Sequence, residues 1–406
     1  SNIIFFDVIS LKLSIISLSK FSIEVFEKNV SSLICFLEIC FNISPHRLVW
    51  AINKSTSFDN SLLFSNSFKL HLLFTNNIHG AIHEVPARFI NPEFSPILAG
   101  GAGAFTYASK LRKEAKLEKD FVMLTDAGNI FQGSQLGTYD GGSNIIKWMN
   151  WMAYDALAPG VRDFDQGVNN LSQLASEANF PFIASNLEGV DGIEDYKIIN
   201  ANGVKIGLIG LITPFISEGL LPEYYEGVAV SDIMKTLGAQ IEKIRSDVDL
   251  IFVLSHLGIP YDREDEYDDF IKDIEQGVER PIRNAIELAH FTDEVDVIIT
   301  GGVSKGYDTP WVDPTNHTIV LQNYGNLTGL GHLVLHIDNQ NKVIENYSFP
   351  TERGMMVNLF TDDIWPDKVI QDSIKNWIDV LPSLEESDYS KPVSYTHLTL
   401  PTNREV

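Results

Sequence analysis

The chain has 406 residues, 44% of them hydrophobic, and a formal net charge of −24. This length and hydrophobic content suffice for one large or two ordinary globular domains. The acidic balance argues against the basic surfaces with which proteins bind nucleic acids or anionic membranes. No uninterrupted apolar run approaches about 18 residues, so we predict no transmembrane helix.

Both cysteines of the chain, Cys35 and Cys40, lie in its first tenth. From position 41 onward there is none, which excludes a disulfide framework and a thiolate zinc site for the main body. The cysteine count does not indicate the cellular compartment.

Residues 1–67 differ in composition from the remainder of the chain. They are rich in Ser, Ile, Phe, Leu and Asn, contain almost no Gly and lack a clean periodicity. Asp7 interrupts the first apolar run and no basic start precedes it, so the segment lacks the features of a signal peptide. Three interpretations stay open: a genuine extension, a degenerate targeting segment, or translated upstream sequence that is not native protein.

From residue 68 onward, apolar runs of strand length alternate with segments of helical spacing, which predicts an α/β fold. Residues 262–290 are acidic with helical spacing, and we expect a solvated helix pair there or, alternatively, a partner-binding face. We expect strands at 69–75, 121–125, 180–186, 204–212, 249–254, 295–300, 318–322 and 331–337, and helices at 100–117, 144–152, 231–246 and 367–380.

Short polar segments follow several of the predicted strands, where α/β proteins usually place their functional sites. The first follows 69–75 and is the most distinctive, because an apolar run ends abruptly in small polar residues, a His and a Gly. The segments read Thr75-Asn76-Asn77-Ile78-His79-Gly80, Asp126-Ala127-Gly128-Asn129 with Phe131-Gln132-Gly133-Ser134, Gly160-Val161-Arg162-Asp163-Phe164-Asp165-Gln166-Gly167, Ser255-His256-Leu257-Gly258, and Gly301-Gly302-Val303-Ser304-Lys305.

These five motifs, in this order, resemble those of the 5′-nucleotidase/UDP-sugar hydrolase branch of the calcineurin-like metallophosphoesterases. The resemblance covers about residues 68 to 380. It implies a four-layer α/β/β/α sandwich of mixed sheets over 68–352. It also implies that 353–389 is a connector helix to a second, C-terminal domain that this chain lacks. The tail, 390–406, resembles a translated sequencing adapter.

The resemblance also implies a set of site residues. The family uses two divalent metals that activate a water, while a His stabilises the transferring phosphoryl group. At the positions of two metal-binding Asp residues this sequence has Asn77 and Asn129. The metal-binding Asn and the catalytic His of the third motif are replaced by Val161 and Arg162.

In the last motif, a metal-binding His and its polar partner are replaced by Val303 and Lys305, so that His79 and His256 remain the only strong ligands at these positions. Two dications need anionic ligands, and amide oxygens are weak substitutes. We therefore expect no metal cofactor, or one metal on His79 and His256 at most. We also expect a catalytically degenerate protein that binds an anion, a nucleotide or a protein partner.

Arg162 and Lys305 could bind a phosphate or another anion without cleaving it. The alternative is that they form buried salt bridges with Asp126, Asp163 or Asp165, which would leave an inert scaffold. A second function class is an active nucleotide or sugar-nucleotide hydrolase with one metal on His79 and His256 plus Asp126 or Asp163. A sulfur-oxidation thiohydrolase shares the fold, but nothing in the sequence is specific for it. The family is largely exported, so the resemblance implies a periplasmic or extracellular location.

Overall fold

The structure is a computed structural model that describes residues 67–382. The expected extension at 1–67, with Cys35 and Cys40, and the expected tail at 390–406 fall outside the described residues, except for Ser67. Among the described residues no helix is both long and apolar enough to cross a membrane.

The first of two large sheets has eight strands in the order β17-β16-β1-β4-β5-β6-β8, with β18 paired to β16. β1 runs parallel to β4 and antiparallel to β16, so the sheet is mixed. Its strands are β1 (Ser67–Thr75), β4 (Phe121–Asp126), β5 (Ala156–Leu157), β6 (Phe182–Ile183), β8 (Ile193–Glu194), β16 (Gly329–Asp338), β17 (Val343–Ser348) and β18 (Met356–Asn358).

The second sheet has six strands in the order β14-β15-β13-β12-β10-β9 and is also mixed. Its strands are β9 (Tyr196–Ala201), β10 (Val204–Ile212), β12 (Leu250–His256), β13 (Val297–Thr300), β14 (Trp311–Val312) and β15 (Ile319–Leu321). Two small ladders pair β2 (Val85–Pro86) with β3 (Ile97–Leu98), and β7 (Leu187–Glu188) with β11 (Ala229–Val230).

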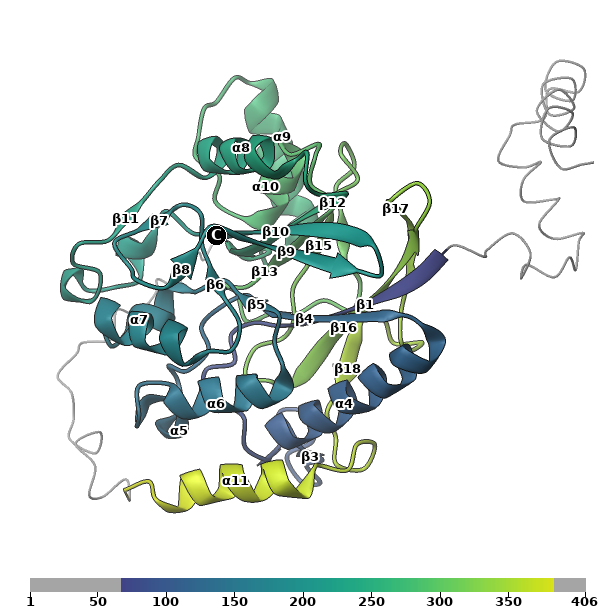
Figure 1. Cartoon of the computed structure of the whole chain (residues 1–406). Coiled ribbons are helices and arrows are strands. Elements are labelled where there is room, and N and C mark those ends of the chain that lie inside the picture. Colours follow the sequence, from purple (N-terminus) through teal and green to yellow (C-terminus); the bar gives the residue numbers. More distant parts are fainter. Residues whose placement is uncertain (1–66, 383–406) are drawn as a thin grey trace, which may run out of the picture. The chain divides into compact units, whose positions relative to one another are not determined.

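Helices cover the outer face of each sheet (Figure 1). The α-helices are α4 (Gly100–Glu118), α5 (Gln135–Thr138), α6 (Ser143–Met152), α7 (Val168–Glu177), α8 (Ile233–Ile244), α9 (Arg263–Glu275), α10 (Ala285–His290) and α11 (Lys368–Asp379). Short 3₁₀ turns are η2 (Val161–Phe164), η3 (Ile216–Glu218) and η4 (Pro222–Tyr224).

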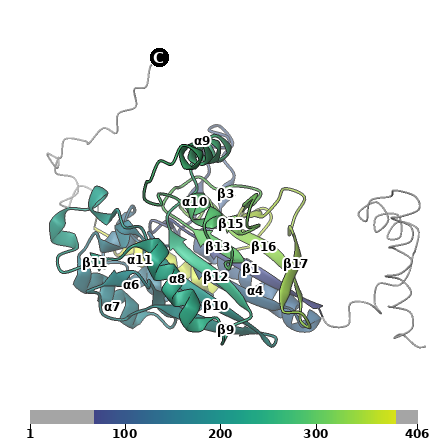
Figure 2. The same ribbon diagram turned by 90° about the horizontal axis from the view of Figure 1, so that it is seen from above.

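The side chains of β1 show how the layers are held together. Leu72 and Phe74 belong to the apolar cluster that also contains Leu208 of β10 in the facing sheet. Leu73, pointing the other way, belongs to the cluster with Trp148 of α6. Alternate residues of a strand face opposite sides, so one strand fills two cores. In Figures 1 and 2 the two large sheets lie between layers of helices, which confirms the predicted α/β/β/α sandwich.

Two expectations about the elements need correction. The strand expected at 180–186 is only Phe182–Ile183, because the chain turns away to form β7 soon afterwards. Two solvated helices are expected at 262–290. The prediction is confirmed for α9, in which Tyr267 and Phe270 are the only buried residues. It is wrong for α10, whose residues 285–289 are all buried. Its apolar side chains belong to the core cluster, and Glu287 accepts from the backbone N–H of Arg283.

The segment expected to be a connector, 353–389, is described as far as 382 and packs on the domain. Asp367 caps α11 by accepting from the backbone N–H groups of Val369 and Ile370, which satisfies otherwise free donors of the first turn. Ile374 is buried against the cluster beneath α4 and α6. Trp377 stacks on Trp151 of α6 with ring centroids 5.3 Å apart.

Ile374→Ala should therefore lower the free energy of unfolding by about 2–5 kcal/mol, because it removes buried methyl groups and leaves a cavity. The matched control is Val369→Ala on the same helix, where the side chain is 72% exposed and the change should stay within about 0.5 kcal/mol. Urea unfolding of both variants measures the difference. Equal stabilities would contradict the docking of α11.

Candidate functional site

The candidate centre lies at the carboxyl ends of β1, β4, β12 and β13, where the loops that follow these strands meet. β1 is parallel to β4 in one sheet, and β12 is parallel to β13 in the other. Their loops are joined directly: the backbone N–H of Asn77 donates to the Gly128 carbonyl at 2.8 Å, and the N–H of Gly302 donates to Asn77 Oδ1 at 3.2 Å. Motifs far apart in the sequence therefore form one site, as strand-end placement predicts.

Asn77 and Asn129, the asparagines of the first two motifs, hydrogen-bond to each other. Asn129 Nδ2 donates to Asn77 Oδ1 at 3.3 Å, and Asn129 Oδ1 accepts from the backbone N–H of Arg162 at 2.8 Å. Asn77 is 1% and Asn129 6% exposed. Both have left-handed backbone angles, φ 51° and 63°, which Asn tolerates better than most residues. Two neutral amides can therefore pair here without a cation between them.

Both histidines are held by their Nδ1 atoms. His79 Nδ1 donates to the Gln132 carbonyl at 2.8 Å, and His256 Nδ1 donates to the Ala127 carbonyl at 2.5 Å. A carbonyl only accepts, so Nδ1 carries the hydrogen and Nε2 keeps its lone pair. Burial lowers the pKa of both imidazoles, that of His256 to about 4. Both are neutral at pH 7, in the tautomer that metal-binding histidines usually adopt.

Gly160 leaves the space in which these groups meet. A Cβ at this position would lie 2.4 Å from Asn129 Oδ1 and 2.6 Å from His256 Cε1. Any larger residue would push the amide and the imidazole apart. The close approach of His256 to this loop explains why Gly160 belongs to the site, although it carries no chemistry itself.

Arg162 lies at the rim of the candidate centre, on η2 next to Val161. Its side chain is 46% exposed, and Nη1 lies 3.6 Å from Asp165 Oδ1. Its positive charge contributes to the lowered pKa of His79. Val161 packs near Gly219, where a Cβ would lie 2.9 Å from Val161 Cγ1. The expected salt bridge of Arg162 thus forms with Asp165, in a half-exposed position that contributes little stability.

The ammonium group of Lys305 contacts two tyrosines. Its Nζ donates to the Tyr261 carbonyl at 2.5 Å and lies 5.0 Å from the centroid of the Tyr307 ring. Within residues 67–382 it forms no ion pair with any Asp of the centre, so the expected buried salt bridge is wrong for Lys305. Val303 packs against Gly258, where a Cβ would lie 2.7 Å from Val303 Cγ2. The contacts of Arg162 and Lys305 do not bring the two cations together.

The carboxylate of Asp163 binds the loops of the centre together. Its oxygens accept from the backbone N–H groups of Asn129 at 2.8 Å, Ile130 at 2.7 Å and Gly160 at 2.7 Å. Burial raises the pKa of Asp163 to about 6, although these three hydrogen bonds act in the opposite direction. The sequence motif includes this Asp, but only the structure identifies its backbone partners.

Asp126 is also committed to local structure. One oxygen accepts from Thr75 Oγ1 at 2.6 Å and the other from the Gly128 N–H at 2.7 Å. Burial raises the pKa of Asp126 well above its usual value, and the nearby Asp163 adds to the shift.

The donor atoms of the centre do not fit two divalent metals. Two amides bond to each other, two positions are valines, and the two nearby carboxylates accept from protein N–H and O–H groups. Within the part of the chain that the structure describes, no three His, Cys, Asp or Glu side chains converge as a metal site would need. The free ligands are the Nε2 atoms of His79 and His256.

Comparisons with known proteins agree on one group of relatives. No family model matches the sequence. The 5′-nucleotidase of Rattus norvegicus is 24% identical over 348 residues, which is 82% of this chain and 56% of the relative. The 5′-nucleotidase of Homo sapiens is 25% identical over 350 residues, with the same coverage. The chain therefore spans about half the length of the curated relatives it matches.

Solved structures share the fold. A 5′-nucleotidase precursor from Thermus thermophilus superposes with a TM-score of 0.61 and 20% identity, over 79% of this chain and 60% of that one. The sulfate thiohydrolase SoxB of Thermus thermophilus gives 0.61 at 13% identity, over 76% and 59%. The calcineurin-like phosphoesterase YfkN of Bacillus subtilis gives 0.58 at 20%, over 77% and 97%. At these identities the likeness shows the fold alone.

Asp163→Asn should lower the free energy of unfolding by about 1–3 kcal/mol at pH 7, because one backbone donor loses its acceptor. The pKa of Asp163 is about 6 when folded, above the ordinary 3.8. Between these values the folded state binds more protons, so the contribution of this group to stability falls as pH rises. The asparagine of the variant does not titrate, so the variant lacks this pH dependence. The difference in free energy of unfolding between the wild type and Asp163→Asn should therefore become smaller from pH 4 to pH 6.

Urea unfolding at pH 4, 5, 6 and 7 measures this prediction. The control is Asp191→Asn, which makes the same chemical change at an exposed position and should change stability by less than about 0.5 kcal/mol at each pH. A constant deficit across the series would show that Asp163 keeps one protonation state in that range.

Proposed function

Because the chain belongs to the 5′-nucleotidase family of calcineurin-like metallophosphoesterases, we propose that it is a non-catalytic member that binds a ligand or a partner protein. The observation that carries this proposal is the hydrogen bond between Asn129 Nδ2 and Asn77 Oδ1. A carboxylate pair at these positions would repel unless a cation lay between its members. Two neutral amides hydrogen-bond to each other, so these loops can pack together without a metal ion.

The loss of the catalytic side chain supports the same proposal. Arg162 stands where the family has the His that stabilises the transferring phosphoryl group, and a guanidinium stays protonated at pH 7, so it cannot act as a general acid or base. Its charge also lowers the pKa of His79, which opposes a cation at the adjoining position. The proposed location, periplasmic or extracellular, follows from the family resemblance.

Metal content separates this proposal from catalysis. We expect the full chain, incubated with Mn²⁺ and Zn²⁺ and then dialysed, to retain less than about a tenth of a metal per chain by elemental mass spectrometry, since the centre offers only two free neutral ligands. Two metals per chain would overturn the proposal.

A back-substituted variant provides the matched control. Asn77→Asp with Asn129→Asp restores both anionic positions and should melt a few degrees lower than wild type in EDTA, since the carboxylates then repel. Mn²⁺ should restore its melting temperature and leave that of the wild type unchanged. Asn346→Asp with Asn376→Asp adds the same charge at exposed positions, and its melting temperature should not respond to metal.

A second function is favoured by one observation. His79 and His256 both keep a free Nε2 while Nδ1 donates to a backbone carbonyl. This arrangement suits one metal and therefore an active phosphoesterase with a rearranged site. Asp126 and Asp163 are poor candidates for a third ligand, because their oxygens already accept hydrogen bonds. One metal per chain, lost in a His256→Ala variant, would support this function.

The class of ligand can also be tested. Of the two cations at the motif positions, Lys305 is hydrogen-bonded to the Tyr261 carbonyl, which leaves Arg162 for anion binding. If an anion is the ligand, millimolar phosphate or nucleotide should raise the melting temperature of the wild type and not of Arg162→Ala. The control is Lys305→Ala, which should respond as the wild type does. No shift with either compound would remove anions and leave a protein partner.

A further inference from the structure

Four Asn-x-Ser/Thr tripeptides lie in the described part of the chain. This tripeptide is the acceptor of N-linked oligosaccharides in exported proteins, and it is short enough to occur by chance. The burial and hydrogen bonds of each Asn therefore decide whether the folded domain could carry a glycan. The tripeptides are Asn170-Leu171-Ser172, Asn316-His317-Thr318, Asn326-Leu327-Thr328 and Asn346-Tyr347-Ser348.

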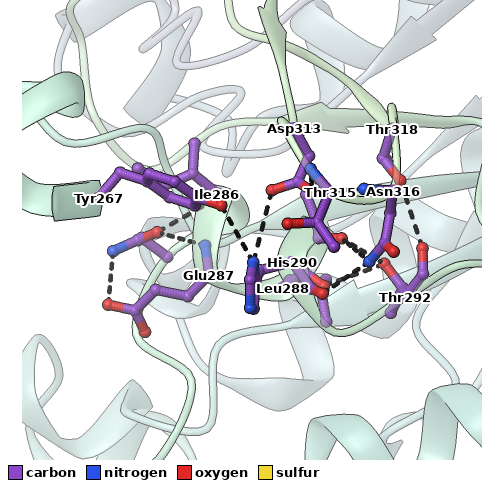
Figure 3. Close-up of polar contacts among 12 residues, drawn as sticks. Tyr267, Ile286, Glu287, Leu288, His290, Thr292, Asp313, Thr315, Asn316 and Thr318 are labelled. Atoms are coloured by element: carbon purple, nitrogen blue, oxygen red, sulfur yellow. Dashed lines mark hydrogen bonds and ion pairs between the residues drawn. The ribbon is translucent and has the colours of Figure 1, made fainter. Parts of the chain in front are cut away.

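The structure uses the side chain of Asn316. Its Nδ2 donates to the carbonyls of Ala289 and His290 at 3.1 and 2.6 Å, and its backbone N–H donates to Asp313 Oδ1. The hydroxyl of Thr318 is buried and donates to the carbonyls of Thr292 and Val295. Figure 3 shows Asn316 pointing into this network, which ties α10 to the loop before β15. A sugar on Nδ2 would break these contacts.

The side chain of Asn170 is also in use. Its Nδ2 donates to the Gly141 carbonyl at 2.9 Å. Its Oδ1 lies so close that a Cβ on Gly141 would be 2.4 Å away. The amide thereby joins α7 to the turn before α6.

Asn326 and Asn346, in contrast to Asn170 and Asn316, have exposed side chains that the fold does not use. Among residues 67–382, neither side-chain amide has a hydrogen-bond partner, and the backbone N–H of Asn326 donates to the Asn77 carbonyl. Asn326 has a left-handed backbone angle, φ 56°, in the turn between β15 and β16. Asn346 lies on β17, the edge strand of the eight-stranded sheet. A glycan at either position displaces no side-chain contact of the fold.

We propose that Asn326 and Asn346 are N-glycosylation sites and that Asn170 and Asn316 are not. In the transfer, the Nδ2 atom forms a bond to C1 of an oligosaccharide carried on a polyprenyl diphosphate. The bond between C1 and the diphosphate oxygen breaks, the polyprenyl diphosphate leaves, and the amide releases one proton. The host transferase and its lipid-linked donor supply this chemistry, so the reaction requires export but does not depend on the function of the centre.

A glycan would have a different effect at each of these two sites. Asn326 lies one hydrogen bond from Asn77, 2.7 Å between the backbone N and O atoms, so a glycan there stands beside the candidate centre. Asn346 lies next to the exposed Tyr347 on an unpaired sheet edge, where a bulky hydrophilic group prevents pairing with another strand.

The test is site-specific mass spectrometry of the full chain, produced with a cleavable secretion leader in insect cells. Peptide-N-glycosidase F in ¹⁸O water converts each glycosylated Asn into labelled Asp. We expect label at Asn326 and Asn346 and unmodified Asn at 170 and 316. The leader forces export, so the result is independent of the native location and of the metal measurement.

The Thr328→Ala and Ser348→Ala variants keep each Asn but remove the hydroxyl that the transferase requires. Each should lose one glycan, seen as one step in gel mobility. Absence of label at Asn326 and Asn346, or label at Asn316 or Asn170 in folded protein, would overturn the proposal. If the chain is retained in the cell, translation with microsomes gives the same readout. Three further tripeptides begin at residues 29, 42 and 53 and lie outside the described residues. Label at these three positions does not bear on the proposal.

Discussion

At the meeting point of the loops of the centre, two amides hydrogen-bond to each other, from Asn129 Nδ2 to Asn77 Oδ1. This hydrogen bond joins the loop after β1 to the loop after β4, and the Gly302 N–H joins the loop after β13 to the same oxygen. The side chains at the meeting point of these loops can be either two neutral amides or two carboxylates with a cation between them. The amide pair requires no ion. The neighbouring motif residues do not bind cations either, since Val161 and Val303 are apolar and Arg162 is positively charged.

Further hydrogen bonds hold the backbone and the imidazoles around this amide pair. Asp163 fixes three backbone N–H groups of two loops. The backbone carbonyls of Gln132 and Ala127 orient the two imidazoles. These contacts position side chains for coordination, although the coordinating set is incomplete. These contacts hold two imidazoles beside a pair of hydrogen-bonded amides.

Much of the fold could be predicted from the sequence, because buried strands such as 204–212 read as continuous apolar runs, and the expected and observed bounds agree. The burial of α10 could not, since its short apolar run lies inside an acidic segment and only tertiary packing decides its environment. At the centre, the motifs indicated which loops meet. The direction of Lys305 was not predictable, because a long side chain can reach either towards the centre or, as found, to the Tyr261 carbonyl.

The buried ionisable groups of the centre have opposite effects on stability as the pH changes. His256 has a lowered pKa of about 4, so the unfolded chain takes up its proton first and acid weakens the fold. Asp163 has a raised pKa of about 6, so the folded chain takes up its proton first and acid strengthens the fold. Over the same interval the two contributions offset each other. Where the two titration ranges overlap, between about pH 4 and pH 6, these two side chains thus act as a compensating pair within the centre.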